Sequence, residues 1–152
     1  MTLSVEELAA HVFATRNGAH LAHWKTTSYA QHMALGEFYE ALPALIDEIM
    51  EVHFGQIEGK DIKPVRQVAT PKPETIVDYI ANEAKWIRQS RDSFSDNETI
   101  KALIDDLSAC YDKCLYKLKR FSDETEDREE AAQGQDAGPE GQGARRQAQS
   151  VG

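Results

Sequence analysis

Three histidines lie close together in the first third of the chain. His20 and His23 are three residues apart, so a helix would place them on the same side. His32 follows a short polar break at residues 26–28. If the chain folds back at this break, His32 lies roughly opposite His23. Imidazole is a common ligand of transition metals, so this spacing predicts a histidine pair contributed by two neighbouring helices.

Acidic residues continue from His32 along the second of these helices. At about 100° per residue, Asp47 and Glu51 fall beside His32 on a helical wheel, largely away from the apolar stripe. Charges at helical spacing usually form only a solvated helix face. Asp47 lies 15 residues after His32, or about 22 Å along the helix. The two side chains therefore cannot bind one ion within a single chain.

Antiparallel packing of two copies of this helix across a two-fold axis would remove that obstacle. The acids of one chain would then approach the histidines of the other, giving two equivalent sites per dimer. Mixed imidazole and carboxylate ligands suit iron, and they also suit zinc and manganese. We therefore predict a shared catalytic metal site formed by His23, His32, Asp47 and Glu51. Weaker ligand candidates are His20, Glu37 and Glu40.

Four segments have the hydrophobic periodicity of amphipathic helices. Short polar links join the first segment to the second and the third to the fourth, and no segment shows the alternation of a β-strand. These features predict an all-α, antiparallel four-helix bundle. The predicted segments run from Ser4 to about Trp24, from Ser28 to Phe54, from Pro73 to about Phe94, and from Ser95 through Leu118.

Several residues predict local features of these helices. Ser4 with Glu7, and Ser95 with Glu98, have the spacing of capping boxes at helix starts. Gly18, inside the first helix, indicates a closely packed neighbour, because glycine otherwise weakens a helix by about 1 kcal/mol. Pro43 should bend the second helix, and Gly55 is predicted as its C-cap. His11 and His53 lie on helix faces without a partner that the sequence identifies.

Composition divides the 152-residue chain into a bundle at residues 1–121 and an acidic tail at 122–152. The tail has eight acidic and three basic side chains and almost no aliphatic ones, so we predict that it is disordered. The net charge of −9 opposes binding to nucleic acid. No signal peptide or membrane-spanning run is present, which favours a cytoplasmic protein with reduced Cys110 and Cys114.

Residues 19–51, AHLAHWKTTSYAQHMALGEFYEALPALIDEIME, resemble the signature of the Dps family of ferritin-like miniferritins. In that family a His-Trp pair ends the first helix, and the second helix has a histidine followed by acids fifteen and nineteen residues later. His23-Trp24, His32, Asp47 and Glu51 match this pattern. The family also has an aspartate four residues after the second histidine, where this chain has Gly36.

The resemblance implies a ferritin-like fold and a ferroxidase centre shared between two subunits. It also implies that ferrous iron is bound and oxidised by peroxide or dioxygen, often within a twelve-subunit shell. The segment is similar, too, to small ferritin-like proteins encoded by bacteriophages, in which case the protein would act in the host cytoplasm.

Two other functions are compatible with the sequence. Gly36 and the acidic tail also suit a metal-free structural or interaction protein on the same scaffold, for example a phage virion or accessory component. A protein that protects DNA is the third hypothesis, by analogy with the Dps family. The acidic charge argues against it, and we expect no shift of DNA in a gel.

Overall fold

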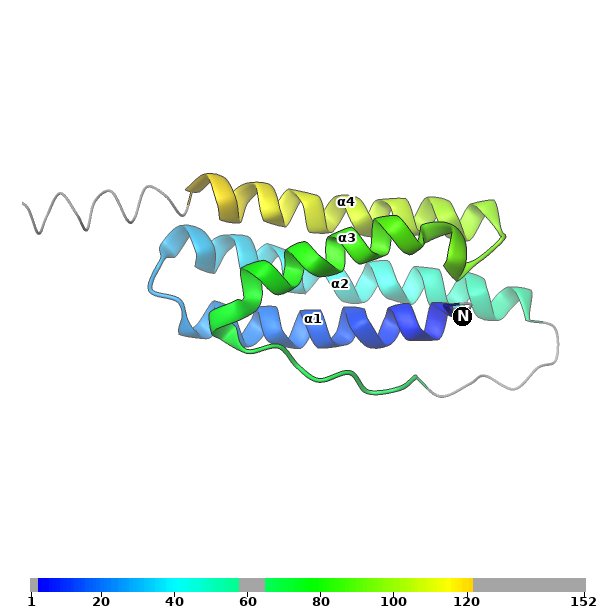
Figure 1. The fold of residues 1–152 in the computed structure, drawn as a ribbon, viewed down its shortest axis with the longest axis horizontal. Helices are drawn as coiled ribbons and strands as arrows, with labels where there is room; N and C mark the ends of the chain where they lie inside the picture. Colours follow the sequence, from blue (N-terminus) through cyan, green and yellow to red (C-terminus); the bar gives the residue numbers. More distant parts are fainter. Residues whose placement is uncertain (1–2, 58–64, 122–152) are drawn as a thin grey trace, which may run out of the picture.

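The computed structural model describes residues 3–57 and 65–121, which form four helices packed side by side (Figure 1). The helices are α1 (Val5–Lys25), α2 (Tyr29–Gln56), α3 (Ile76–Phe94), which follows a short 3-10 turn at Pro73–Thr75, and α4 (Glu98–Phe121). No strand occurs within the described residues. The predicted all-helical bundle is therefore confirmed. The tail predicted for residues 122–152 lies outside the described part of the chain.

Contacts near the helix ends show how α1 and α2 are aligned. His53, near the end of α2, lies against Glu6 at the start of α1, whereas His32 lies against His23 near the end of α1. The chain thus reverses at residues 26–28, as the sequence predicts. On its other side α2 packs against α4, and α3 packs against α4 and α1.

Side chains at the helix starts confirm part of the predicted capping. The Ser4 hydroxyl accepts a hydrogen bond from the Glu7 amide at 3.1 Å, and the Ser28 hydroxyl accepts one from the Gln31 amide at 3.2 Å. Ser95 was predicted to cap α4, but this prediction is wrong. The Asn97 carboxamide oxygen instead accepts from the amides of Thr99 at 2.9 Å and Ile100 at 3.2 Å. Asn is as good a helix cap as Ser, so the nearer residue takes the role.

The glycines of the first two helices differ in their surroundings. A Cβ atom added to Gly18 would lie 2.3 Å from the Cγ atom of Pro71, which confirms the predicted close neighbour. Pro43 lies inside α2, as predicted. Gly55 does not end α2, because the helix continues through Gln56 and its C-cap is Ile57. The apolar periodicity predicted an end at Phe54, two residues before the observed end of α2.

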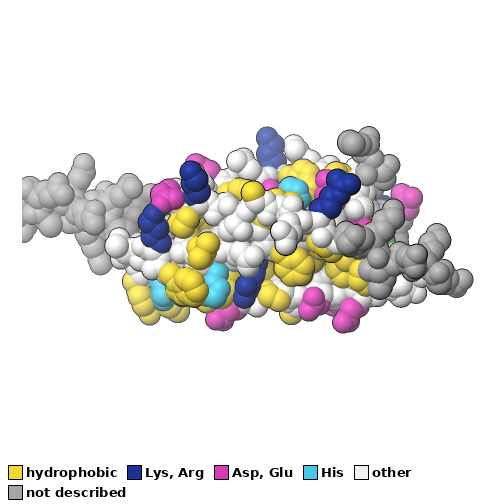
Figure 2. Space-filling model, turned by 90° about the horizontal axis from the view of Figure 1, so that it is seen from below, with side chains coloured by type: hydrophobic (Ala, Val, Ile, Leu, Met, Phe, Trp, Pro, Cys, Tyr) yellow, Lys and Arg dark blue, Asp and Glu magenta, His cyan; other side chains and the backbone are white. Residues whose placement is uncertain are grey.

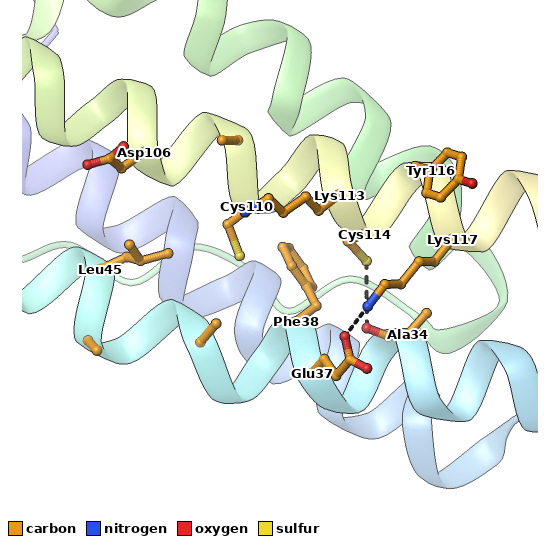
Figure 3. A pocket seen from close by; sticks show the side chains of 13 residues that line it. Ala34, Glu37, Phe38, Leu45, Asp106, Cys110, Lys113, Cys114, Tyr116 and Lys117 are labelled. Carbon is orange, nitrogen blue, oxygen red and sulfur yellow. Dashed lines mark hydrogen bonds and ion pairs between the residues drawn. The ribbon is translucent and has the colours of Figure 1, made fainter.

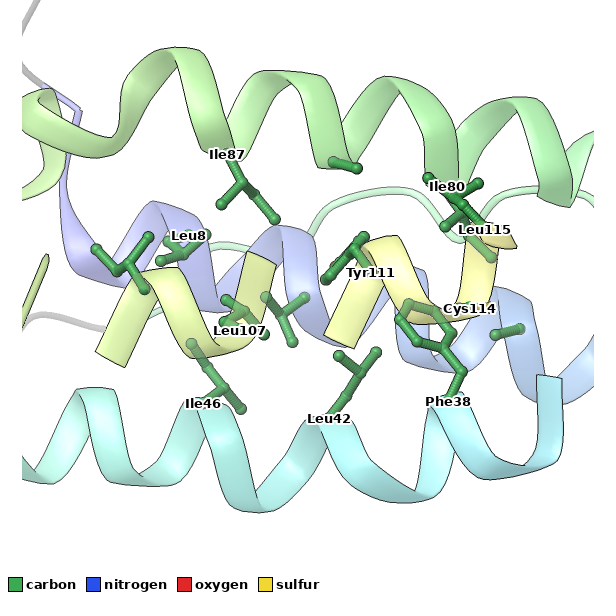
Figure 4. Close-up of a cluster of buried hydrophobic side chains, with 14 of the residues drawn as sticks. Leu8, Phe38, Leu42, Ile46, Ile80, Ile87, Leu107, Tyr111, Cys114 and Leu115 are labelled. Atoms are coloured by element: carbon green, nitrogen blue, oxygen red, sulfur yellow. The ribbon is translucent and has the colours of Figure 1, made fainter. Parts of the chain in front are cut away.

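The core is a continuous layer of aliphatic and aromatic side chains between the helices (Figure 4). Each fully buried Leu, Ile or Phe stabilises the fold by about 1.5–3 kcal/mol relative to an exposed one. Among the described residues, no helix is both long enough and apolar enough to cross a membrane. Residues that are almost completely buried include Leu8, Leu35, Leu42, Ile46, Ile80, Ile87, Leu107 and Tyr111.

Candidate metal centre

His23 and His32 form the predicted histidine pair at the turn between α1 and α2. Their rings are stacked, with centroids 3.7 Å apart and an angle of 20° between the ring planes. Each ring also contacts the main chain of the other residue. The Nδ1 atom of His23 lies 2.7 Å from the carbonyl oxygen of His32, and the Nδ1 atom of His32 lies 2.9 Å from the carbonyl oxygen of His23.

These two contacts define the protonation of the rings. A carbonyl oxygen can only accept a hydrogen bond, so both Nδ1 atoms must carry the proton. A neutral imidazole protonated at Nδ1 has its lone pair on Nε2. Metal-binding histidines usually have one ring nitrogen held by such a hydrogen bond and the other free for the metal. Both rings are half-buried and therefore meet solvent along part of their edge.

The contact made by His32 also completes the end of α1. His23 lies in the last turn of α1, where carbonyl oxygens have no amide partner within the helix. The His32 ring donates to this carbonyl oxygen. The pair therefore stabilises the turn whether or not a metal binds.

Gly36 of α2 lies against the ring of His23. A Cβ atom at position 36 would lie 3.1 Å from the Cε1 atom and 3.3 Å from the Nδ1 atom of His23, which is closer than ordinary van der Waals contact. The His23 ring thus packs directly on the backbone of α2. An aspartate at position 36 would collide with this ring unless the ring moved.

Aromatic side chains surround the histidine pair. The His20 ring stacks on Tyr39 with centroids 4.0 Å apart, and it lies 4.4 Å from the ring of Trp24. The Trp24 side chain is 68% exposed in the single chain. Tyr29, beside His32, is 76% exposed. In Figure 2 hydrophobic side chains lie next to histidines at this end of the molecule.

The predicted acidic ligands lie elsewhere on the surface of the same chain. Asp47, Glu51 and Glu40 are exposed on α2, and Glu37 forms an ion pair with Lys117 of α4. Within residues 3–57 and 65–121, no group of three or more histidine, cysteine or acidic side chains could hold a metal ion. The histidine pair and the side chains of Asp47 and Glu51 thus do not come together within one chain, as the length of helix between them predicts.

Two histidine–glutamate contacts are not predicted by the sequence. The Nδ1 atom of His11 lies 2.9 Å from a carboxylate oxygen of Glu83, and the His53 Nε2 atom lies 3.3 Å from one of Glu6. Burial raises the pKa of the Glu83 carboxyl above its usual value, although the charge and hydrogen bond of His11 act in the opposite direction. These partners are 72 and 47 residues apart, so no local spacing reveals them.

Residues 23–118 match the sequence profile of DUF5856, which is described as a family of unknown function. The chain belongs to this family. No curated protein and no solved structure matches the chain. The matched DUF5856 region begins at His23 and includes His32, Asp47 and Glu51, so every residue of the predicted site lies within it.

Acidic side chains occur along the whole exposed face of α2 in this DUF5856 protein. Glu37 and Glu40 are exposed in the half near the α1–α2 turn, and Asp47, Glu48 and Glu51 are exposed in the far half. Lys25, at the turn, forms an ion pair with Glu74.

Proposed function

We propose that this protein binds ferrous iron at sites completed by a second copy of the chain, and that it oxidises this iron. The observation that carries the proposal is the pair of half-buried imidazoles whose Nδ1 atoms are both held by main-chain carbonyl oxygens. That arrangement leaves two oriented Nε2 atoms without a described partner. The scaffold would be an antiparallel, ferritin-like bundle.

The stacking of the two rings favours two ions rather than one. An imidazole lone pair lies in the plane of its ring, and these planes are nearly parallel with centroids 3.7 Å apart. Both lone pairs therefore cannot point at a single ion unless a ring turns. Each imidazole would then bind its own ion, as in proteins with two-metal sites. His23 and His32 would each hold one ion.

The carboxylates would come from Asp47 and Glu51 of the second copy. Both are exposed, and α2 of that copy would lie antiparallel to α2 of the first. Exposed Trp24, Tyr29 and Met33 surround the histidines and would become buried in this contact. A donor set of imidazole nitrogen and carboxylate oxygen fits iron. Gly36 contributes no ligand, so this set has one carboxylate fewer than the Dps pattern.

The substrate would be ferrous iron, which loses one electron per ion to dioxygen or peroxide. The imidazoles and carboxylates of this chain would bind the ions, and the carboxylates would offset the charge of the ferric product. Exposed rings of Trp24 and Tyr29 would exclude water from the edge of the site once a second copy covered them.

An anaerobic titration with ferrous iron, followed by addition of peroxide, tests the proposal. We expect about two ions per chain if each imidazole holds its own ion. Asp47→Asn combined with Glu51→Gln should abolish binding, whereas Glu48→Gln, a matched change on the same exposed helix, should not. Absence of stoichiometric binding together with no ferric absorbance would end the proposal.

Mixed dimers test whether the site is shared between chains. His32→Asn keeps a side-chain N–H for the His23 carbonyl oxygen but lacks the Nε2 ligand. Chains with this change and chains with the Asp47→Asn/Glu51→Gln pair should each be inactive alone. Random mixing makes about half of the dimers hybrid, each with one intact site, so about a quarter of the original sites should return. No recovery would show that the ligands do not come from two chains.

A second candidate function is a metal-free interaction protein. It is favoured by the hydrogen bond from His32 to the His23 carbonyl oxygen, which gives the pair a complete structural role at the end of α1. This function predicts protein purified without metal and the same oligomeric mass for His32→Asn as for the natural chain. Elemental analysis and mass measurement in solution distinguish it from the first.

A further inference from the structure

A groove of about 650 Å³ lies between α2 and α4, on a different side of α2 from the histidine pair. Ala34, Phe38 and Ala41 line it from α2, and Cys110 and Cys114 line it from α4 (Figure 3). Two further alanines, Ala44 and Ala109, border the same space. Alanine side chains end one carbon from the backbone, so they leave space that larger residues would fill. Sites for small molecules commonly have this size and apolar lining.

Charged side chains follow the α4 edge of the groove. Asp106 lies toward one end, Lys113 comes about two turns later, and Lys117 lies one further turn along. Lys117 reaches across to Glu37 of α2 and closes that end of the groove (Figure 3). Within the described ranges, Lys113 has no carboxylate at ion-pair distance. The groove thus combines an apolar floor with an uncompensated cation at its rim.

We infer that this groove binds an amphipathic carboxylate, such as a medium-chain fatty acid. The carboxylate would lie at Lys113 and Lys117, where charge-assisted hydrogen bonds are strongest. The alkyl chain would run past Phe38 and Cys110 toward Leu45. The path from Lys113 to Asp106 covers seven residues of α4, or about 10 Å, which sets the useful length of the chain.

The ion pair across the groove favours a narrow ligand over a helix from another protein. A helix with its side chains is about 10 Å wide, so one lying along this groove would have to displace the contact between Lys117 and Glu37. An alkyl chain is much narrower and fits between that contact and Leu45 without displacing it. The charges also favour an anion at the end with Lys113 and Lys117. Glu37 balances Lys117 there and, within the described part of the chain, Lys113 stays unpaired, whereas the acidic Asp106 is at the other end.

Binding of decanoate to the intact protein, measured by calorimetry, tests this inference. We expect one site, and octanoate should bind more weakly, by about fourfold for each methylene that leaves the groove. Decyltrimethylammonium has the same alkyl chain with the opposite charge and should bind at least tenfold more weakly than decanoate. Equal binding of the two would show that Lys113 does not select a carboxylate and would overturn the inference.

The two cysteines provide a direct report of occupancy. Burial raises the pKa of the Cys110 thiol, and it raises that of Cys114 to about 12, so alkylation requires mildly alkaline solution. Decanoate in the groove should slow alkylation of Cys110, the more accessible of the two. Binding that leaves its alkylation rate unchanged would place the ligand elsewhere.

Two variants with a matched control complete the test. Lys113→Gln should weaken decanoate binding by about tenfold without changing the fold, whereas Lys85→Gln, on the exposed side of α3, should have no effect. Ala41→Phe should fill the groove and abolish binding while circular dichroism stays unchanged. Decanoate binding that survives Lys113→Gln at full strength would contradict the inference even if Ala41→Phe failed to fold.

A second copy of the chain is the main competing occupant. In that case Cys110 would resist alkylation in the assembled protein without any ligand and would become reactive on dilution to the monomer. That result would overturn the inference.

Discussion

Replacement of Gly36 by alanine tests the geometry on which the histidine pair depends. The added Cβ atom would lie 3.1 Å from Cε1 and 3.3 Å from Nδ1 of His23, so the ring would have to move by a few tenths of an ångström. Gly55→Ala is the matched control, because it is the same change in the same helix with no neighbouring atom within 4 Å.

Both substitutions gain the higher helix propensity of alanine, and they differ in whether the added Cβ atom presses on a neighbouring side chain. Alanine in a helix is favoured over glycine by about 1 kcal/mol, so Gly55→Ala should stabilise the protein by up to that amount. At position 36 the displaced ring would weaken both hydrogen bonds between the histidines, which contribute about 0.5–1.5 kcal/mol each. We therefore expect Gly36→Ala to lower the free energy of unfolding by up to about 2 kcal/mol relative to the natural chain. The free energy of unfolding of Gly36→Ala should be about 1–3 kcal/mol lower than that of Gly55→Ala.

Urea unfolding followed by circular dichroism measures both free energies. Nitrogen chemical shifts of the two imidazoles give an independent reading, because they distinguish the protonated ring nitrogen from the one with the lone pair. In the natural chain both Nδ1 atoms should be protonated, and Gly36→Ala should disturb this state for His23. If Gly36→Ala stabilised the protein as much as Gly55→Ala, the ring of His23 would not lie against α2 and our account of the site would be wrong.

Three further predictions concern the bundle itself. Gly18→Ala should lower the free energy of unfolding in urea, because the added Cβ atom would lie 2.3 Å from a ring carbon of Pro71. Such overpacking costs about 1–3 kcal/mol. Unchanged stability would contradict the packing of residues 65–72 on α1. Burial raises the pKa of the Glu83 carboxyl in the folded state, so folding favours its protonated form. The free energy of unfolding should therefore fall as the pH rises from about 4.5 through the raised pKa. Glu83→Gln should remove this decline, and an identical pH profile for the two proteins would refute the assignment. Finally, mass spectrometry of protein alkylated in mildly alkaline solution should show modification at Cys110 before Cys114, since the pKa of Cys114 is raised to about 12. Prior labelling of Cys114 would contradict its burial.

Much of the fold was predictable from local patterns. Apolar residues at helical spacing gave all four helices, because burying such a stripe is what stabilises an amphipathic helix in a protein. The break at residues 26–28 was sufficient to place His32 beside His23. A short turn fixes how the two helices that flank it are aligned, so the position of His32 could be predicted without knowledge of the other helices.

Features that depend on tertiary contacts were not predictable. The partnership of His11 with Glu83 joins residues 72 positions apart, and only the assembled bundle determines it. Asn97 replaced Ser95 as the cap of α4, since both residue types can cap and the sequence does not distinguish neighbouring positions. The antiparallel ferritin-like identity and the shared metal site stay predictions.

The reciprocal hydrogen bonds of the histidine pair serve a structural role, but they leave two features of this surface unexplained. Completing the end of α1 requires a single N–H donor, which an asparagine could supply without a second ring nitrogen at the surface. Trp24 and Tyr29 are also largely exposed beside the pair, at 68% and 76%. Large aromatic side chains in that state are typical of surfaces that a partner covers. The proposed metal-binding dimer and the proposed metal-free interaction protein would therefore use the same surface, and they differ in whether the Nε2 atoms are needed. His32→Asn separates them, because it keeps the hydrogen bond and removes only the ligand atom.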